Sequence, residues 1–156
     1  TLFRSAMKKI LMAILALLVF CGSAYAAAGT CVVSYTSVND EVSMITWTWT
    51  ASSTDGSVPN TASGSVKGWV FMATTDPGTP APQASYDIAI NDSDSVDIFG
   101  GELNDLSATD GAHAVPKIGS AYYGQRFVNG TLTMTLTNNN VNSAQGVVKV
   151  YYYRKH

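Results

Sequence analysis

Residues 130–137 read Gly-Thr-Leu-Thr-Met-Thr-Leu-Thr, with an apolar residue at every second position and threonine between. Successive side chains of a β-strand point to opposite faces, so the segment predicts a strand with one buried face and one polar face. Residues 41–51 repeat the pattern, with Ile45, Trp47 and Trp49 on one face and threonines on the other. A chain with two such segments has to fold around β-sheet.

From residue 27 onward the chain has no long stretch with apolar residues at helical spacing. Thr, Val, Ser, Tyr and Trp occur instead in short runs that are broken by Gly, Asn, Asp and Pro. Runs of this kind, at a spacing of roughly ten residues, predict an all-β fold, an antiparallel β-sandwich of about seven or eight strands. The expected strands are residues 30–37, 41–51, 69–73, 86–90, 96–98, 115–118, 130–137 and 147–153.

Three further features of the expected fold depend on local composition. The continuously apolar run 69–73 predicts a central strand that is covered on both faces. Residues 52–64 are rich in Ser, Thr, Gly and Asn and predict a surface loop, whereas the polar stretch 102–113 allows at most one helical turn. The polar segment 138–146 predicts a connection between strands 130–137 and 147–153, which we expect to pair with each other.

The N-terminal residues have the pattern of a secretory signal peptide. Met7-Lys8-Lys9 precedes an uncharged apolar run at 10–20, and Ala24-Tyr25-Ala26 follows as a small-residue cleavage site. We therefore expect residues 1–26 to comprise a short adapter-like leader, which reads like a translated sequencing-adapter end, and a signal-peptide helix. Residues 27–156 should form a single domain. The apolar run is shorter than the roughly 20 residues that a membrane span needs. A secreted or periplasmic location without stable membrane insertion is the expectation.

Removal of residues 1–26 makes the expected domain acidic. The domain then holds 6 basic residues against 11 acidic ones, a net charge of −5. This balance argues against a nucleic-acid partner, because binding to phosphates needs clustered Lys and Arg. Of the two cysteines only Cys31 remains, so the stability of the domain has to come from its core and not from an intrachain disulfide.

An acidic turn joins the runs 86–90 and 96–98. Asp92, Asp94 and Asp97 supply hard oxygen ligands at close spacing, and this is the chemistry that calcium prefers. The alternative is that short acidic side chains satisfy the backbone amides of a turn. The twelve-residue calcium loop, with its glycine at position six and its terminal glutamate, is absent from the sequence. Turn chemistry is therefore the main interpretation, and a calcium site at these three residues is the alternative.

Nothing in the sequence predicts a catalytic centre. Nucleophilic catalysis needs a Ser or Cys with a histidine base, but the expected domain holds only His113, which we interpret as a loop residue, and His156. Two histidines and one cysteine also lack zinc-ligand spacing. The expectation is a protein that is not an enzyme and needs no cofactor; a hydrolase with paired carboxylates is the least supported alternative.

Aromatic residues provide the candidate binding surface. The three tryptophans lie in apolar strand patterns, so we expect core packing for them. Three consecutive tyrosines end the last expected strand, and alternation forces at least one ring out of the core. Tyr151 and Tyr153 are therefore candidate binding residues, for a protein partner or for a glycan.

The segment 86–101, with the pattern Tyr-Asp-Ile…Asp-x-Asp-x-x-Asp-Ile-x-Gly-Gly, resembles a segment of small virion-associated or prophage-encoded structural proteins of tailed phages. The resemblance extends over about residues 69–151, through the stretches 75–78, 115–116, 127–130 and 146–150. In this sequence Ser95 stands at a turn position where glycine is expected. The resemblance implies a non-enzymatic β-sandwich that acts by protein–protein contacts or self-assembly, in a virion or, given the signal peptide, at the cell surface. A secreted module that binds carbohydrate or calcium is the alternative.

Overall fold

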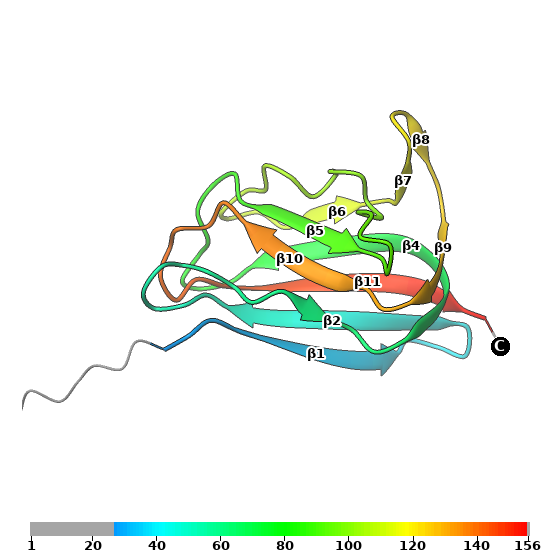
Figure 1. Cartoon of the computed structure of the whole chain (residues 1–156), viewed down its shortest axis with the longest axis horizontal. Coiled ribbons are helices and arrows are strands. Elements are labelled where there is room, and N and C mark those ends of the chain that lie inside the picture. The colour runs from blue at the N-terminus through cyan, green and yellow to red at the C-terminus, as the bar shows by residue number, and fades with distance from the viewer. Residues whose placement is uncertain (1–26, 156) are drawn as a thin grey trace, which may run out of the picture.

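The computed structural model describes residues 27–155, and the expected leader and signal peptide lie outside them. These residues form eleven strands in antiparallel sheets and contain no helix (Figure 1). In chain order the strands are β1 Thr30–Ser37, β2 Val42–Thr50, β3 Thr61–Ala62, β4 Val66–Pro77, β5 Asp87–Asn91, β6 Ala112–Ala114, β7 Lys117–Ile118, β8 Tyr122–Tyr123, β9 Arg126–Gly130, β10 Thr133–Thr137 and β11 Gln145–Arg154. The all-β expectation is confirmed, and no helix in residues 27–155 is long and apolar enough to cross a membrane.

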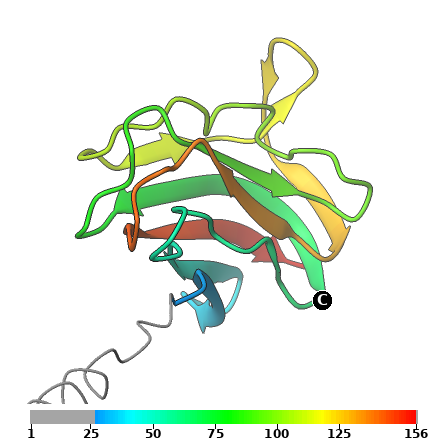
Figure 2. The same cartoon turned by 60° about the vertical axis from the view of Figure 1, so that its left-hand side comes forward.

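The strands are arranged in one large sheet, one small sheet and a separate hairpin. The six-stranded sheet has the order β1-β2-β11-β4-β6, and β9 pairs with the same edge of β4 as β6 but at the other end of the strand. The three-stranded sheet has the order β3-β10-β5 and lies alongside the large sheet (Figures 1 and 2). Strands β7 and β8 pair only with each other and project from the domain.

Both sheets contribute to one apolar core. In β2, Ile45, Trp47 and Trp49 are at most 1 % exposed, as their alternation predicts, and Val148 and Val150 of β11 are fully buried beside them. The small sheet and the residue that precedes β10 add an equally alternating set, which consists of Ile88, Ile90, Leu132, Met134 and Leu136. Burial of a side chain of this size stabilises the fold by about 1.5–3 kcal/mol.

Specific contacts join the two sheets within this core. The indole Nε1 of Trp47 donates a hydrogen bond of 3.0 Å to the carbonyl oxygen of Thr61 in β3. The ring of Trp49 lies against Gly146 of β11, where an added Cβ atom would stand 2.5 Å from the ring. A side chain at position 146 would therefore displace the Trp49 ring.

A β-bulge divides β4 into two halves with opposite phase. The register with β11 shifts between Tyr151 and Tyr152, so that Phe71 is the extra residue. Before the bulge the even-numbered residues Val66 and Val70 are buried, and after it the odd-numbered Ala73 and Thr75 are buried. Phe71 and Met72 remain half-buried. The continuous apolar run 69–73 in the sequence therefore corresponds to a β-bulge in the structure.

This arrangement corrects the interpretation of residues 69–73. We expected a strand covered on both faces, and β4 is indeed central, with β11 on one side and β6 and β9 on the other. Its outer face, however, is open, because Trp69 is 44 % exposed. The expectation of core packing is confirmed for Trp47 and Trp49 and is wrong for Trp69.

The expected pairing of strands 130–137 and 147–153 is also wrong. Strand β10 pairs with β5 and β3, whereas β11 pairs with β2 and β4 in the other sheet. The expected strand 130–137 itself is divided, because Gly130 ends β9 in the large sheet and Thr133 begins β10 in the small one. Leu132, which lies between them, exchanges hydrogen bonds with Ser63. The chain therefore changes sheets inside one alternating segment.

Three smaller expectations also need correction. The expected loop 52–64 contains β3, and His113 lies in β6 and not in a loop. Residues 102–111 form turns and bends and β6 begins at Ala112, which agrees with the expectation of at most one helical turn in this stretch. The run 96–98 is not a strand, although Ile98 donates a backbone hydrogen bond to Ile90 and a bridge joins Asn91 to Asp97.

The contact between Trp47 and Thr61 gives a test of the core. We expect Trp47→Phe to lower the free energy of unfolding by about 1–3 kcal/mol, because it removes the indole donor and leaves the carbonyl of Thr61 without that partner. Trp47→Ala should cost about 3–5 kcal/mol through the cavity that it leaves. Urea denaturation followed by circular dichroism measures both. A change of less than about 0.5 kcal/mol for Trp47→Phe would contradict the hydrogen-bonding role.

Candidate functional site: an acidic turn, an aromatic surface and a projecting arm

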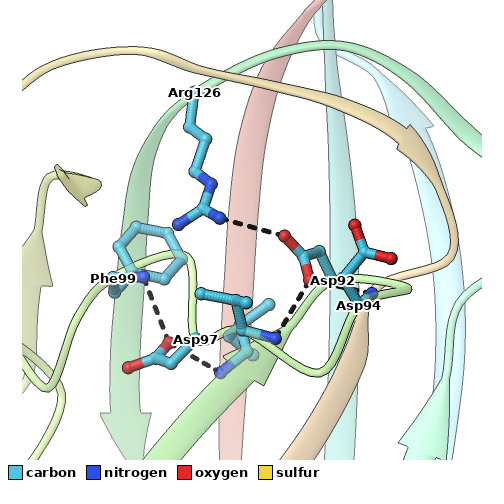
Figure 3. A network of polar contacts seen from close by, with 7 residues as sticks. Asp92, Asp94, Asp97, Phe99 and Arg126 are labelled. Carbon is cyan, nitrogen blue, oxygen red and sulfur yellow. Dashed lines mark hydrogen bonds and ion pairs between the residues drawn. The ribbon is translucent and has the colours of Figure 1, made fainter. Parts of the chain in front are cut away.

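Asp92 organises the turn that follows β5. Its Oδ1 accepts hydrogen bonds of 3.0 Å from the backbone amides of Asp94 and Val96, and its Oδ2 accepts one of 3.0 Å from Nη2 of Arg126 (Figure 3). Arg126 belongs to β9, so this ion pair joins the turn to the large sheet. Within the turn Ser95 has φ +63°, a left-handed conformation that favours glycine. The expectation of glycine at this position thus has a structural basis.

Asp97 satisfies backbone amides on the other side of the same turn. Its Oδ1 accepts hydrogen bonds from Ile90 (3.3 Å) and Phe99 (3.1 Å), and its Oδ2 accepts one from Gly101 (2.7 Å). Phe99 is fully buried in the core. The carboxylate of Asp97 therefore holds the chain where it enters the core after the turn.

The three aspartates do not form one cluster of ligands. In Figure 3 the carboxylate of Asp97 points away from those of Asp92 and Asp94. Asp94 is exposed, and among residues 27–155 no three His, Cys, Asp or Glu side chains are placed to hold a metal ion. The geometry supports the turn interpretation. Calcium binding at Asp92, Asp94 and Asp97 stays a prediction that needs its own measurement.

The turn geometry predicts unequal effects for two matched substitutions. Asp97→Asn should lower the free energy of unfolding by about 1–3 kcal/mol, because a charged acceptor of three backbone amides is replaced by a neutral amide with one acceptor oxygen. Asp94→Asn at the exposed tip should stay within about 0.5 kcal/mol of the parent protein. Chemical denaturation measures both values, and a larger loss for Asp94→Asn would contradict the assignment.

Five rings lie together on the outer face of the large sheet, which is turned away from the core. The rings of Trp69 and Phe127 are 5.2 Å apart, and Phe71 lies 4.7 Å from Tyr153 and 6.2 Å from Tyr151. Three adjacent strands, β9, β4 and β11, supply the rings. Nζ of Lys155 stands 5.7 Å from the ring centre of Phe127. We call these five residues the aromatic surface.

The sequence identified only part of this surface. Tyr153 is 37 % exposed, and Tyr151 is half-buried between its neighbours on β2 and β4. Trp69 and Phe127, which are 44 % and 40 % exposed, were not expected in it. The uninterrupted apolar run 69–73 was the available signal, because a run that breaks the period of two marks either a doubly covered strand or a bulge.

Strands β7 and β8 form a projecting arm, seen at the upper right of Figure 1. One face of the arm is fixed to the domain: Glu102 Oε1 accepts hydrogen bonds from Nζ of Lys117 (2.7 Å) and from the hydroxyl of Tyr123 (3.0 Å). The other face presents Ile118 and Tyr122, which are 51 % and 77 % exposed. The hydrogen bond from Lys117 lowers the pKa of Glu102 most, and the hydrogen bond from Tyr123 lowers it further.

The contacts of Glu102 predict a pH dependence of the arm. Because the pKa of Glu102 is lowered in the folded protein, its contacts are present above the ordinary glutamate pKa of about 4.3 and are lost as the pH falls through the lowered value. The NMR signals of the Tyr123 ring should therefore change only below the ordinary glutamate range. In Glu102→Gln this transition should vanish. A Tyr123 transition in the parent protein at the ordinary glutamate pKa would contradict the contact.

The residues that were weighed for catalysis do not come together. Cys31 is half-buried in β1, and burial raises the pKa of its thiol, which lowers its nucleophilic character at neutral pH. His113 is exposed in β6, where its register partner is Thr74. Glu102, a carboxylate that a hydrolase with paired carboxylates could use, is engaged with Lys117 and Tyr123.

Comparisons with known proteins add one distant structural likeness. No protein-family model matches the chain, and no curated protein matches it. Among solved structures, a chain of the cyanophage Pam1 capsid asymmetric unit is similar, with 18 % sequence identity, a TM-score of 0.36, and coverage of 86 % of this chain and 90 % of that chain.

Proposed function

We propose that the protein is a non-enzymatic structural protein that assembles through protein–protein contacts, and that the aromatic surface makes the principal contact. The aromatic surface is the observation that carries the proposal. Trp69, Phe127 and Tyr153 stay exposed on the outer face of the large sheet, although burial of rings of this size is strongly favourable. Aromatic side chains are enriched where proteins bind one another, and exposed apolar patches mark such contacts.

The architecture and the sequence resemblance support the same role. We infer that the two sheets form a β-sandwich around the shared core, so that the aromatic surface is held on a rigid support. The resemblance to small structural proteins of tailed phages, over about residues 69–151, favours a virion-associated protein. The signal-peptide pattern of residues 1–26 favours export, and a secreted or periplasmic surface protein is the corresponding location.

The projecting arm is a second element that is suited to a protein contact. Its outer face exposes Ile118 and Tyr122, while its inner face is fixed through Glu102. The fixed face limits the freedom that the arm would lose on binding, which reduces the entropic cost of association.

A secreted module that binds carbohydrate or calcium is the second candidate. The exposed rings favour it, because a flat aromatic face also suits stacking against a sugar. The calcium part has a simple test: a ligand that binds only the folded state raises the melting temperature. We expect equal melting temperatures with calcium and with a chelator, and a clear rise with calcium would restore the site at Asp92, Asp94 and Asp97.

The proposed contact predicts the effect of removing the two most accessible aromatic side chains of β4 and β11. We expect Trp69→Ala/Tyr153→Ala to weaken binding to copies of the protein, or to structural proteins encoded by neighbouring genes, by about tenfold or more. Sedimentation velocity and pull-down with the purified partners measure this effect. Val38→Ser, which alters an apolar residue 53 % exposed in the β1–β2 turn, is the control and should leave binding unchanged.

Two outcomes would contradict the proposed function. One is a protein that stays monomeric at its highest soluble concentration and binds none of these structural proteins. The other is binding that survives the double substitution at Trp69 and Tyr153. Circular dichroism should establish that the variant is folded, because both side chains lie outside the core.

A further inference from the structure

The charges of the domain are strongly separated along the chain. Residues 87–110, which we call the acidic segment, hold seven of the eleven acidic residues and neither lysine nor arginine. This segment starts with β5 of the small sheet and ends before β6. Ile98, Phe99, Leu103 and Leu106 of this segment are buried in the core, whereas Asp94, Asp105 and Asp110 are exposed.

Several carboxylates of the acidic segment are not neutralised within the domain. Residues 27–155 contain two ion pairs, Lys117–Glu102 and Arg126–Asp92. Asp94, Asp105 and Asp110 are exposed and belong to neither pair. Asp110 accepts hydrogen bonds only from the neutral hydroxyls of Ser107 and Thr109. The acidic segment therefore presents uncompensated negative charge.

Lysines surround the aromatic surface. Lys67 precedes Trp69 by two positions in β4, and Lys149 precedes Tyr151 by two positions in β11, so each shares a strand face with its ring. The backbone amide of Lys155 donates to the carbonyl oxygen of Lys67, and its Nζ lies over Phe127. These three lysines are half of the six basic residues from position 27 onward, and the two ion pairs of the described chain involve none of them.

We propose that the aromatic surface of one copy, with Lys67, Lys149 and Lys155, docks against the acidic segment of a second copy. Charge complementarity selects this occupant: a domain of net charge −5 carries a basic rim around its largest exposed aromatic group, and the matching negative surface lies on the same chain. Complementary charges steer association and fix its orientation, while the rings supply the desolvated centre of the contact.

The contact joins two different surfaces and is therefore heterologous. Each copy that offers its acidic segment still has a free aromatic surface, so that further copies can add. Such contacts generate a closed ring if the rotation between copies closes and an open filament if it does not. The inference rests on the proposed function, and it adds the identity of the partner and the orientation of the contact.

Two complementary charge variants test the proposal. The first is Lys67→Glu/Lys149→Glu/Lys155→Glu. The second is Asp94→Lys/Asp105→Asn/Asp110→Lys; Asn is chosen at position 105 because Asp105 has φ +53°, which Asn tolerates better than Lys. Sedimentation velocity over a concentration series, at about 50 mM and about 500 mM NaCl, measures self-association; the higher salt screens exposed charges beyond a few ångströms.

We expect the parent protein to self-associate more tightly at the lower salt concentration. Each variant alone should associate at least about tenfold more weakly, because like charges then face each other. An equimolar mixture of the two variants should regain the association, since the reversed surfaces complement one another. Circular dichroism spectra and melting curves that match those of the parent protein establish that both variants are folded.

The outcomes separate the two proposals. One outcome is self-association that is insensitive to salt and unchanged in both charge variants, yet lost in Trp69→Ala/Tyr153→Ala. This result overturns the acidic segment as the partner and leaves the proposed function standing. Binding to another structural protein without any self-association overturns the second copy as the occupant, again without touching the proposed function. Two weakened variants that fail to associate when mixed overturn the proposed pairing of surfaces.

Discussion

The bulge at Phe71 determines which side chains of β4 reach the core and which reach the outer face. Without it, the period of two that buries Val66 and Val70 would continue through Met72 and Thr74 and would turn Asp76 inward. The shift of one residue instead buries Ala73 and Thr75 and leaves Asp76 exposed. Phe71, which the unshifted period would also turn outward, lies on the outer face beside Tyr151 and Tyr153. One irregularity in a central strand thus decides which residues of its second half enter the core.

The three aspartates of the acidic turn have different roles. Asp92 and Asp97 each accept at least two backbone hydrogen bonds, and Asp92 also pairs with Arg126. These two carboxylates stabilise the fold because they accept hydrogen bonds from backbone amides. A buried amide without a partner would cost about as much free energy as a lost hydrogen bond. Asp94, at the tip, has no such role and adds to the negative surface of the domain. Spacing along the sequence does not separate these roles, whereas hydrogen-bond partners do.

The sequence predicted the local elements better than their arrangement. Alternation identified the buried faces of β2 and β10, and the bounds of β1 agree with the expected strand at residues 30–37. The predicted pairing of β10 with β11 was wrong because alternation shows only that a strand has one apolar face. Such a strand fits either sheet equally well. The prediction of core packing for Trp69 was wrong for a related reason. An apolar run without alternation indicates either a strand that is covered on both faces or a β-bulge. The grouping of five rings from β4, β9 and β11 depends on strand order, which alternation does not encode.

The three tryptophans test directly whether the outer face of the large sheet is a contact surface. Trp47 and Trp49 are at most 1 % exposed, whereas Trp69 is 44 % exposed, so iodide should quench the fluorescence of Trp69 alone in dilute protein. We expect this quenchable fraction to disappear as the protein assembles with its copies or its partner. Assembly that leaves Trp69 as accessible to iodide as in the dilute protein would contradict the role of this face as the contact surface.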